Sequence, residues 1–121
     1  MTYPTESQEQ IWLFEWAELL STQYPELSLL HHIPNGGLRA KVTAVRLKAE
    51  GVKPGVPDLF LPVARKGYHG LYIEMKAIKG KLSMNQLTWI EALKKQGYHV
   101  MTCYGFNEAA NVISDYMGIK K

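Results

Sequence analysis

Residues 55–76 read GVPDLFLPVARKGYHGLYIEMK, and the expected fold is built outward from this stretch. Two apolar runs, DLFLPVA at 58–64 and LYIEMK at 71–76, flank the polar connection RKGYHG. Apolar runs separated by turn-forming residues are typical of a β-hairpin. We therefore predict two antiparallel strands that reverse direction near Gly67.

This hairpin would bring two acidic residues together. If the chain reverses near Gly67, Asp58 lies opposite Glu74 or Lys76, depending on the register. Either register places Asp58 and Glu74 on the same face. Lys76 shares that face, because residues two apart on a strand point the same way. Met75 points to the other face, while its backbone carbonyl stays near the carboxylates.

Two neighbouring carboxylates repel each other, so they need a cation between them or a shared proton. Mg²⁺ is commonly bound by one or two carboxylates together with water and phosphate oxygens. We predict that Mg²⁺ or Mn²⁺ is bound by Asp58, Glu74 and the Met75 carbonyl, polarising a phosphate oxygen and lowering the pKa of a water molecule. Lys76 would orient that water or stabilise the negative charge of a phosphodiester transition state. The pattern therefore indicates phosphodiester hydrolysis.

Four motifs follow one another along nearly the whole chain: Pro34-Asn35-Gly36-Gly37, Gly55-Val56-Pro57-Asp58-Leu59, Glu74-Met75-Lys76 and Ser83-x-x-Gln86. This ordered set resembles the VRR-NUC branch of the PD-(D/E)XK, restriction-endonuclease-like nucleases, in its stand-alone phage and bacterial form. The resemblance implies an α/β fold with a mixed β-sheet flanked by helices. It also implies nuclease products with 5′-phosphate and 3′-hydroxyl ends.

The resemblance implies two further site residues. Glu6, at the start of a helix predicted over 6–23, would be an extra metal ligand or contact a water molecule, with Glu9 as the competing assignment. Glu6 would also favour a helix N-terminus through its charge alone. Gln86 would point into the site beside Glu74. Ser83 and Gln86 also form the pattern of a capping box, which needs no catalytic role.

The remaining elements complete the order αβαββαβα. We predict a helix over 6–23 ended by Pro25, a short strand over 27–33, a helix over 38–50 ended by Gly51, a helix from Ser83 to Gln96, a strand over 98–104 and a helix capped by Asn107 and running to Tyr116. The second of these helices is expected to bury Leu38, Val42, Val45 and Ala49. Lys120 and Lys121 are expected to be frayed.

Basic residues gather on both sides of the hairpin. The helix over 38–50 carries Arg39, Lys41, Arg46 and Lys48, and the loop over 77–82 carries Lys79 and Lys81. A charged helix face is usually only solvated. Next to a phosphodiesterase site, we expect contacts to the DNA backbone, which position the strand without reading its sequence. The net charge of +3 agrees with this expectation.

Other candidate residues have less specific patterns. His31 and His32 suggest an HNH-type nuclease, but the paired ligand spacings of such a site do not follow. We expect one of them to be buried and hydrogen-bonded and the other to be exposed near the substrate. Cys103 is the single cysteine and is expected to be a packing residue. With no disulfide, signal peptide or membrane span in the pattern, we expect a cytoplasmic protein of a bacterium or a phage-infected cell.

The 121 residues suit one domain, residues 1–121, with little chain left for a separate reading head. A chain without a reading head suits recognition of DNA shape. The resemblance to stand-alone relatives implies a structure-selective DNA endonuclease that resolves four-way (Holliday) junctions in DNA repair as a homodimer. The alternatives are action on flaps or ends, a catalytically silent nucleic-acid-binding module that keeps the nuclease fold, and a structural or partner-binding domain. Three tryptophans would serve a dimer face or the core: Trp12, Trp16 and Trp89.

Overall fold

The computed structural model describes residues 2–35 and 41–120, without the side chains of Lys41 and Val42. Its elements are α1 (Glu6–Leu20), the 3-10 helix η1 (Pro25–Leu29), β1 (His31–His32), α2 (Lys41–Ala49), β2 (Leu59–Leu61), β3 (Leu71–Lys76), α3 (Met84–Lys95), β4 (His99–Tyr104) and α4 (Phe106–Met117). The predicted order and the mixed α/β class are confirmed. No helix in these described ranges has the length and apolar character needed to span a membrane.

The four strands form one mixed sheet in the order β1-β2-β3-β4. β1 and β3 run antiparallel to β2, whereas β4 runs parallel to β3. The predicted reversal is confirmed: Lys66 and Gly67 both have positive φ, and Tyr68 donates a backbone hydrogen bond to the Arg65 carbonyl at 2.8 Å. Positive φ at both central residues is the geometry of a tight hairpin turn. The hairpin therefore sets β2 and β3 side by side at the centre of the sheet.

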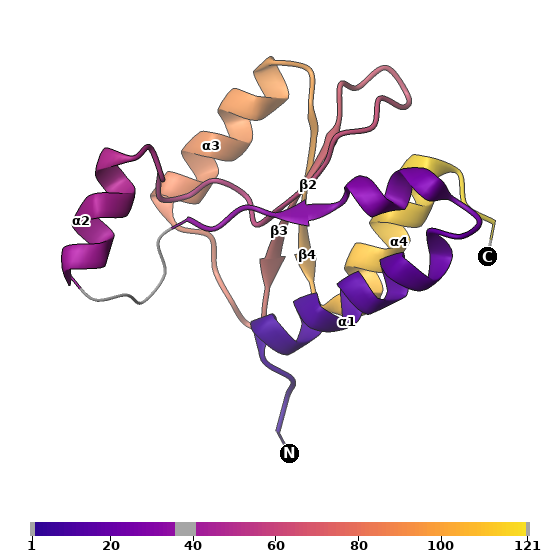
Figure 1. Ribbon diagram of the computed structural model, residues 1–121, viewed down its shortest axis with the longest axis horizontal. Helices are drawn as coiled ribbons and strands as arrows, with labels where there is room; N and C mark the ends of the chain where they lie inside the picture. Colours follow the sequence, from indigo (N-terminus) through magenta and orange to yellow (C-terminus); the bar gives the residue numbers. More distant parts are fainter. Residues whose placement is uncertain (1, 36–40, 121) are drawn as a thin grey trace.

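Helices cover both faces of this sheet. Figure 1 shows α1 and α4 together on one side of the strands and α3 on the other. The larger core lies under α1 and α4 and includes Leu59, Ile73, Met75 and Cys103, which are fully buried. Met75 thus points away from the face that carries Glu74, as predicted. Burial raises the pKa of the Cys103 thiol to about 12, as suits a packing residue.

Two predicted strands are shorter in the structure. β2 ends at Leu61, because Pro62 follows and has no backbone N–H to donate to the sheet. The strand predicted over 27–33 is wrong for most of its length: Pro25 opens η1, and only His31 and His32 pair with β2. α1 likewise ends at Leu20, before residue 23.

The inward face predicted for the second helix is wrong where it is described. Val45 is 62% exposed and Ala49 is exposed, whereas Leu47 is half-buried. Leu38 and the Val42 side chain lie outside the described part. Figure 1 shows α2 standing apart from the sheet, in agreement with the exposure of most of its described side chains. Apolar spacing identifies a stripe on a helix, but it does not say whether other elements reach that stripe.

Asn107 is not the N-cap of the last helix. α4 begins at Phe106, and its N-cap is Gly105, with φ of 100°. The Phe106 N–H is satisfied instead by the Glu9 carboxylate of α1. A local cap pattern could not reveal this bond, because its partners are separated by 97 residues.

Candidate active site

Asp58 and Glu74 lie opposite each other at one end of the hairpin. Leu59 pairs with Ile73, and the same register continued by one residue sets Asp58 against Glu74. This is the first of the two predicted registers. The Asp58 Oδ2 atom accepts a hydrogen bond from the Met75 backbone N–H at 2.8 Å. This bond holds the Asp58 carboxylate beside the backbone of β3.

Glu74 is 1% exposed, which is unusual for a carboxylate. Its Oε2 atom accepts a hydrogen bond from the Gln86 side chain at 3.1 Å, and its buried Oε1 atom has no hydrogen-bond partner among the described residues. Burial and then the negative charge of Asp58 raise the pKa of Glu74 to about 9, against the opposing effect of Lys76. Glu74 consequently holds a proton at neutral pH when no cation is present.

Gln86 forms both of the contacts considered for it at the same time. Its Oε1 atom accepts the Ser83 backbone N–H at 2.8 Å, and its backbone N–H donates to the Ser83 Oγ atom at 3.1 Å. Its Nε2 atom is left free to reach Glu74. The first turn of α3 therefore fixes the amide that orients the buried carboxylate.

The structure separates the two glutamates at the start of α1. Glu6 lies close enough to the site that loss of hydration raises its pKa, and the charge of Asp58 raises it further. Lys76 and the Ala77 backbone oppose this shift. The Glu9 carboxylate instead bonds to Phe106. Glu6 therefore lies near Asp58, whereas the Glu9 carboxylate is bound to the first residue of α4.

Close backbone contacts hold these elements together. Gly55 has φ of 94°, and a Cβ atom there would lie 2.6 Å from the backbone carbon of Asn85 in α3. The Asn35 side chain donates to the Val56 carbonyl at 2.7 Å. These contacts seat the segment before Asp58 against the helix that carries Gln86. The sequence placed Gly55 at the start of the motif that contains Asp58, but its close contact with α3 was not predicted.

Lys76 ends β3, where the following loop closes around its side chain. A Cβ atom on Gly80 would lie 3.3 Å from the Lys76 Cδ atom, and Gly80 donates a backbone hydrogen bond to Ala77 at 2.8 Å. Lys76 is half-buried. The loop thus supports the stem of this lysine beside the two carboxylates.

The donor atoms of the site suit a hard divalent cation. Asp58, Glu74 and the Met75 carbonyl offer oxygen ligands, and the unpartnered Oε1 atom of Glu74 is a buried acceptor that a cation would satisfy. Within residues 2–35 and 41–120, no three His, Cys, Asp or Glu side chains gather closely enough to bind a metal by themselves. Water and phosphate oxygens would therefore complete the coordination, as is usual for Mg²⁺.

A model of the VRR-NUC domain matches residues 1–107. The chain belongs to the VRR-NUC domain family. It is also similar to a solved structure described as a VRR_NUC domain protein, with a TM-score of 0.80 and 29% sequence identity over 99% of this chain and 93% of that chain. No curated protein matches. Membership makes this a nuclease-fold domain, consistent with the PD-(D/E)XK superfamily, and implies nuclease activity on DNA.

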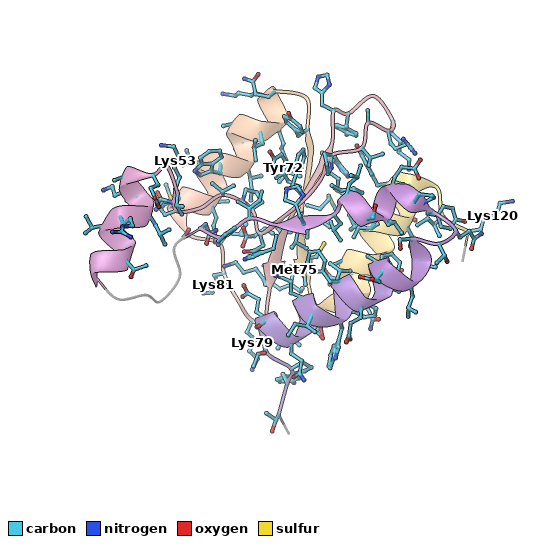
Figure 2. The ribbon with its side chains drawn as sticks, in the orientation of Figure 1. Lys53, Tyr72, Met75, Lys79, Lys81 and Lys120 are labelled. Atoms are coloured by element: carbon cyan, nitrogen blue, oxygen red, sulfur yellow. The ribbon has the colours of Figure 1, made fainter. Side chains whose placement is uncertain are left out.

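The VRR-NUC domain presents several exposed cations on α2 and on the loop between β3 and α3. Arg46, Lys48, Lys79 and Lys81 are exposed, and none forms an ion pair with another described residue. Figure 2 shows Lys79 and Lys81 on the loop between β3 and α3, and Lys53 between α2 and α3. Lys53 was missed in the sequence because it stands alone between helix and hairpin. Arg39 and the Lys41 side chain lie outside the described part.

The remaining candidates of the VRR-NUC domain lie elsewhere or pack internally. His31 and His32 are both exposed, so the expectation of one buried histidine is wrong. The Nδ1 atom of His32 lies 2.9 Å from the Asp58 carbonyl oxygen. Trp16 packs edge-on against Phe106, and Trp89 packs against the smaller core under α3.

Replacing Gln86 with methionine should separate its two roles. The loss of the bond to Glu74 should reduce DNA cleavage by about 10- to 100-fold, which is typical for residues that orient metal ligands. The matched variant Ser83→Ala removes the cap and should cost about 1 kcal/mol of stability, but it leaves the Gln86 Nε2 atom free to bond Glu74. Thermal melts and cleavage rates of the two variants check this. Equal cleavage rates would show that Gln86 acts only as a cap.

Proposed function

We propose that residues 1–121 form one metal-dependent, structure-selective DNA endonuclease that cuts branched DNA, four-way junctions above all, as a homodimer. The alignment of Asp58 with Glu74 supports this most directly, because it sets two carboxylates side by side and leaves one buried oxygen with no hydrogen-bond partner in the described part of the chain. Lys76 stands two residues beyond Glu74 on the same strand. Two carboxylates and a lysine form an arrangement suited to phosphodiester hydrolysis.

In this mechanism each side chain has a distinct task. Asp58 and Glu74, with the Met75 carbonyl, would bind Mg²⁺ or Mn²⁺, which supplies Lewis acidity and a more acidic water molecule. The Met75 N–H and the Gln86 amide hold the two carboxylates in place, so little reorganisation is needed during the reaction. Lys76 orients the attacking water or stabilises the charge that develops on the phosphate oxygens. Glu6 contacts a water molecule at the edge of the site.

The choice of substrate follows from the kind of contacts that the surface offers. The exposed cations on α2 and on the loop after β3 suit phosphate contacts, which carry no base sequence. We therefore favour selection of the substrate by DNA shape over selection by base sequence. Resolution of a four-way junction requires two symmetric cuts, which a two-fold dimer provides. We place this activity in the cytoplasm, where a protein with a single buried cysteine remains reduced.

The test compares cleavage of labelled four-way junction, flap, duplex and single-stranded DNA with Mg²⁺ or Mn²⁺. The wild type should introduce symmetric cuts in the junction with 5′-phosphate ends, and Asp58→Ala and Lys76→Ala should cut no substrate detectably. Sedimentation of the complex should give two protomers per junction. DNA binding without metal-dependent cleavage would overturn the enzyme and favour a silent binding module, and faster cleavage of flaps would overturn the preference for junctions.

A further inference from the structure

A cleft of about 220 Å³ opens where the N-terminal segment passes the ends of β3 and β4. We call it the Tyr104 pocket. The residues that matter in its lining are Tyr3, Glu9, Ala77, Ile78, Tyr104 and Asn107. They come from the segment before α1, from α1, from the loop after β3, from the end of β4 and from α4, so the fold brings together parts far apart in the sequence.

The pocket shares a wall with the candidate active site. Tyr104 is the partner of Lys76 in the parallel register of β3 and β4. Paired residues on neighbouring strands lie about 5 Å apart. Ala77, the residue after Lys76, lines the pocket while its backbone interacts with Glu6. A DNA strand whose phosphate reaches Lys76 therefore passes directly beside this pocket.

The lining suits a flat and uncharged group. Tyr3 is 53% exposed, Ile78 is 53% exposed and Tyr104 is 41% exposed, so apolar surface converges on the cleft from three sides. No lysine or arginine lines it, and the Glu9 carboxylate lies in its wall, so a phosphate would be repelled. The exposed Asn107 amide has no hydrogen-bond partner among the described residues. An apolar cleft with one free polar group is typical of a site for a small ring system.

We propose that the Tyr104 pocket binds one unpaired nucleobase of the DNA strand that lies at Asp58 and Glu74. This inference rests on the proposed nuclease function. The cleft is smaller than the roughly 300–1,000 Å³ of drug-sized sites, which suits one base. The base stacks on the tyrosine rings, and Asn107 bonds to its edge. A paired base stays in its stack, so the pocket favours cleavage sites where a nucleotide can unpair, as at the branch point of a junction or flap.

The test measures binding apart from cleavage, in an Asp58→Ala background without added metal. The probe is a short single-stranded oligonucleotide carrying 2-aminopurine at successive positions. Fluorescence should be quenched at one position, and an abasic residue there should weaken binding by about 10-fold. Tyr104→Ala should weaken binding by a similar factor, whereas Tyr104→Phe, which keeps the ring, should retain it. Asn107→Ala, at an exposed position of α4, tests the pocket without changing a residue of β4.

The control is Leu19→Ala, which removes an exposed apolar side chain on α1 away from the pocket. It should bind the probe like the Asp58→Ala parent. Unchanged binding by both Tyr104→Ala and Asn107→Ala, or the absence of a quenched position, would overturn the pocket. The two proposals can fail separately. Tyr104-dependent quenching without cleavage of any DNA would support the pocket and overturn the nuclease. Cleavage by the wild type, with an unchanged ratio of branched to duplex cleavage in Tyr104→Ala, would support the nuclease and overturn the pocket.

Discussion

Replacing Lys76 with alanine is expected to slow DNA cleavage by about 10²- to 10³-fold, the usual cost of removing one group that stabilises transition-state charge. DNA affinity should change only a few-fold. Lys76 lies on the same strand as Glu74 and is supported by the loop at Gly80. Its charge acts on the Glu74 carboxyl, so we expect its ammonium group to lie near the reacting phosphate. Single-turnover cleavage at saturating DNA measures the chemical step, and equilibrium binding with Ca²⁺ in place of Mg²⁺ measures affinity.

Lys79 and Lys81 provide the matched comparison for Lys76. Both are exposed on the next loop and lie farther from the carboxylates along the chain. Alanine at either position should weaken DNA binding and lower the slope of log K against log salt by about 0.9, as expected for one lost phosphate contact. The chemical step at saturating DNA should be preserved. If Lys76→Ala instead lowers affinity and leaves the chemical step intact, Lys76 is only another phosphate contact.

Replacing Glu74 with glutamine is expected to stabilise the metal-free protein at alkaline pH. The pKa of Glu74 is raised from 4.5 to about 9 in the folded protein, so the folded state keeps a proton that the unfolded state has released. Stability is therefore greatest below pH 4.5 and falls as the pH rises toward 9, by up to about 1.4 kcal/mol for each pH unit. Glutamine has a similar shape and no titration, so this loss should disappear.

Thermal melts from pH 5 to pH 8 in the presence of a chelator measure this effect. The wild type should lose at least about 2 kcal/mol over that range relative to Glu74→Gln, or roughly 8 °C in Tm. Glu91→Gln, a change at an exposed carboxylate on α3, is the control and should follow the wild type. Parallel pH profiles for the wild type and Glu74→Gln would contradict the buried, protonated carboxyl.

Adding Mg²⁺ or Mn²⁺ should reverse the alkaline loss in the wild type alone. A cation that binds the folded state at a hundred times its Kd adds about 2.7 kcal/mol. Glu74→Gln lacks one of the two carboxylates, so its Tm should respond weakly. The same experiment thus tests metal binding without reference to cleavage. An equal rise of Tm in both proteins would assign the metal to another site.

The hairpin was predictable because its information is local. Two apolar runs, a glycine at the turn and the spacing of Asp58 from Glu74 specify two strands and one reversal. The structure has this reversal and one of the two registers that the sequence allowed. The capping pattern of Ser83 and Gln86 was readable for the same reason. These predictions depend on residues that contact each other within one turn or one strand pair.

Other features depended on which elements reach each other in space. Val45 belongs to an apolar stripe but is 62% exposed, so the stripe alone suggested burial that the described part of this helix does not have. Asn107 resembles a helix cap, but a carboxylate from α1 satisfies the start of α4. The choice between Glu6 and Glu9 has the same origin. Both residues lie in the first turn of α1, and only the packing of this helix shows which of them faces the site.

The sequence by itself determined the family, the order of the elements, the hairpin and the proximity of Asp58, Glu74 and Lys76 on one face of it. Only the tertiary structure decided that Glu74 is buried with an oxygen that has no partner among the described residues, and that Gln86 bonds to Glu74 and caps α3 at the same time. It also decided that Tyr104 lines a pocket beside Lys76. The physical reason is that spacing specifies strand faces and helix turns, whereas burial, pKa and cavities arise when separate elements pack together.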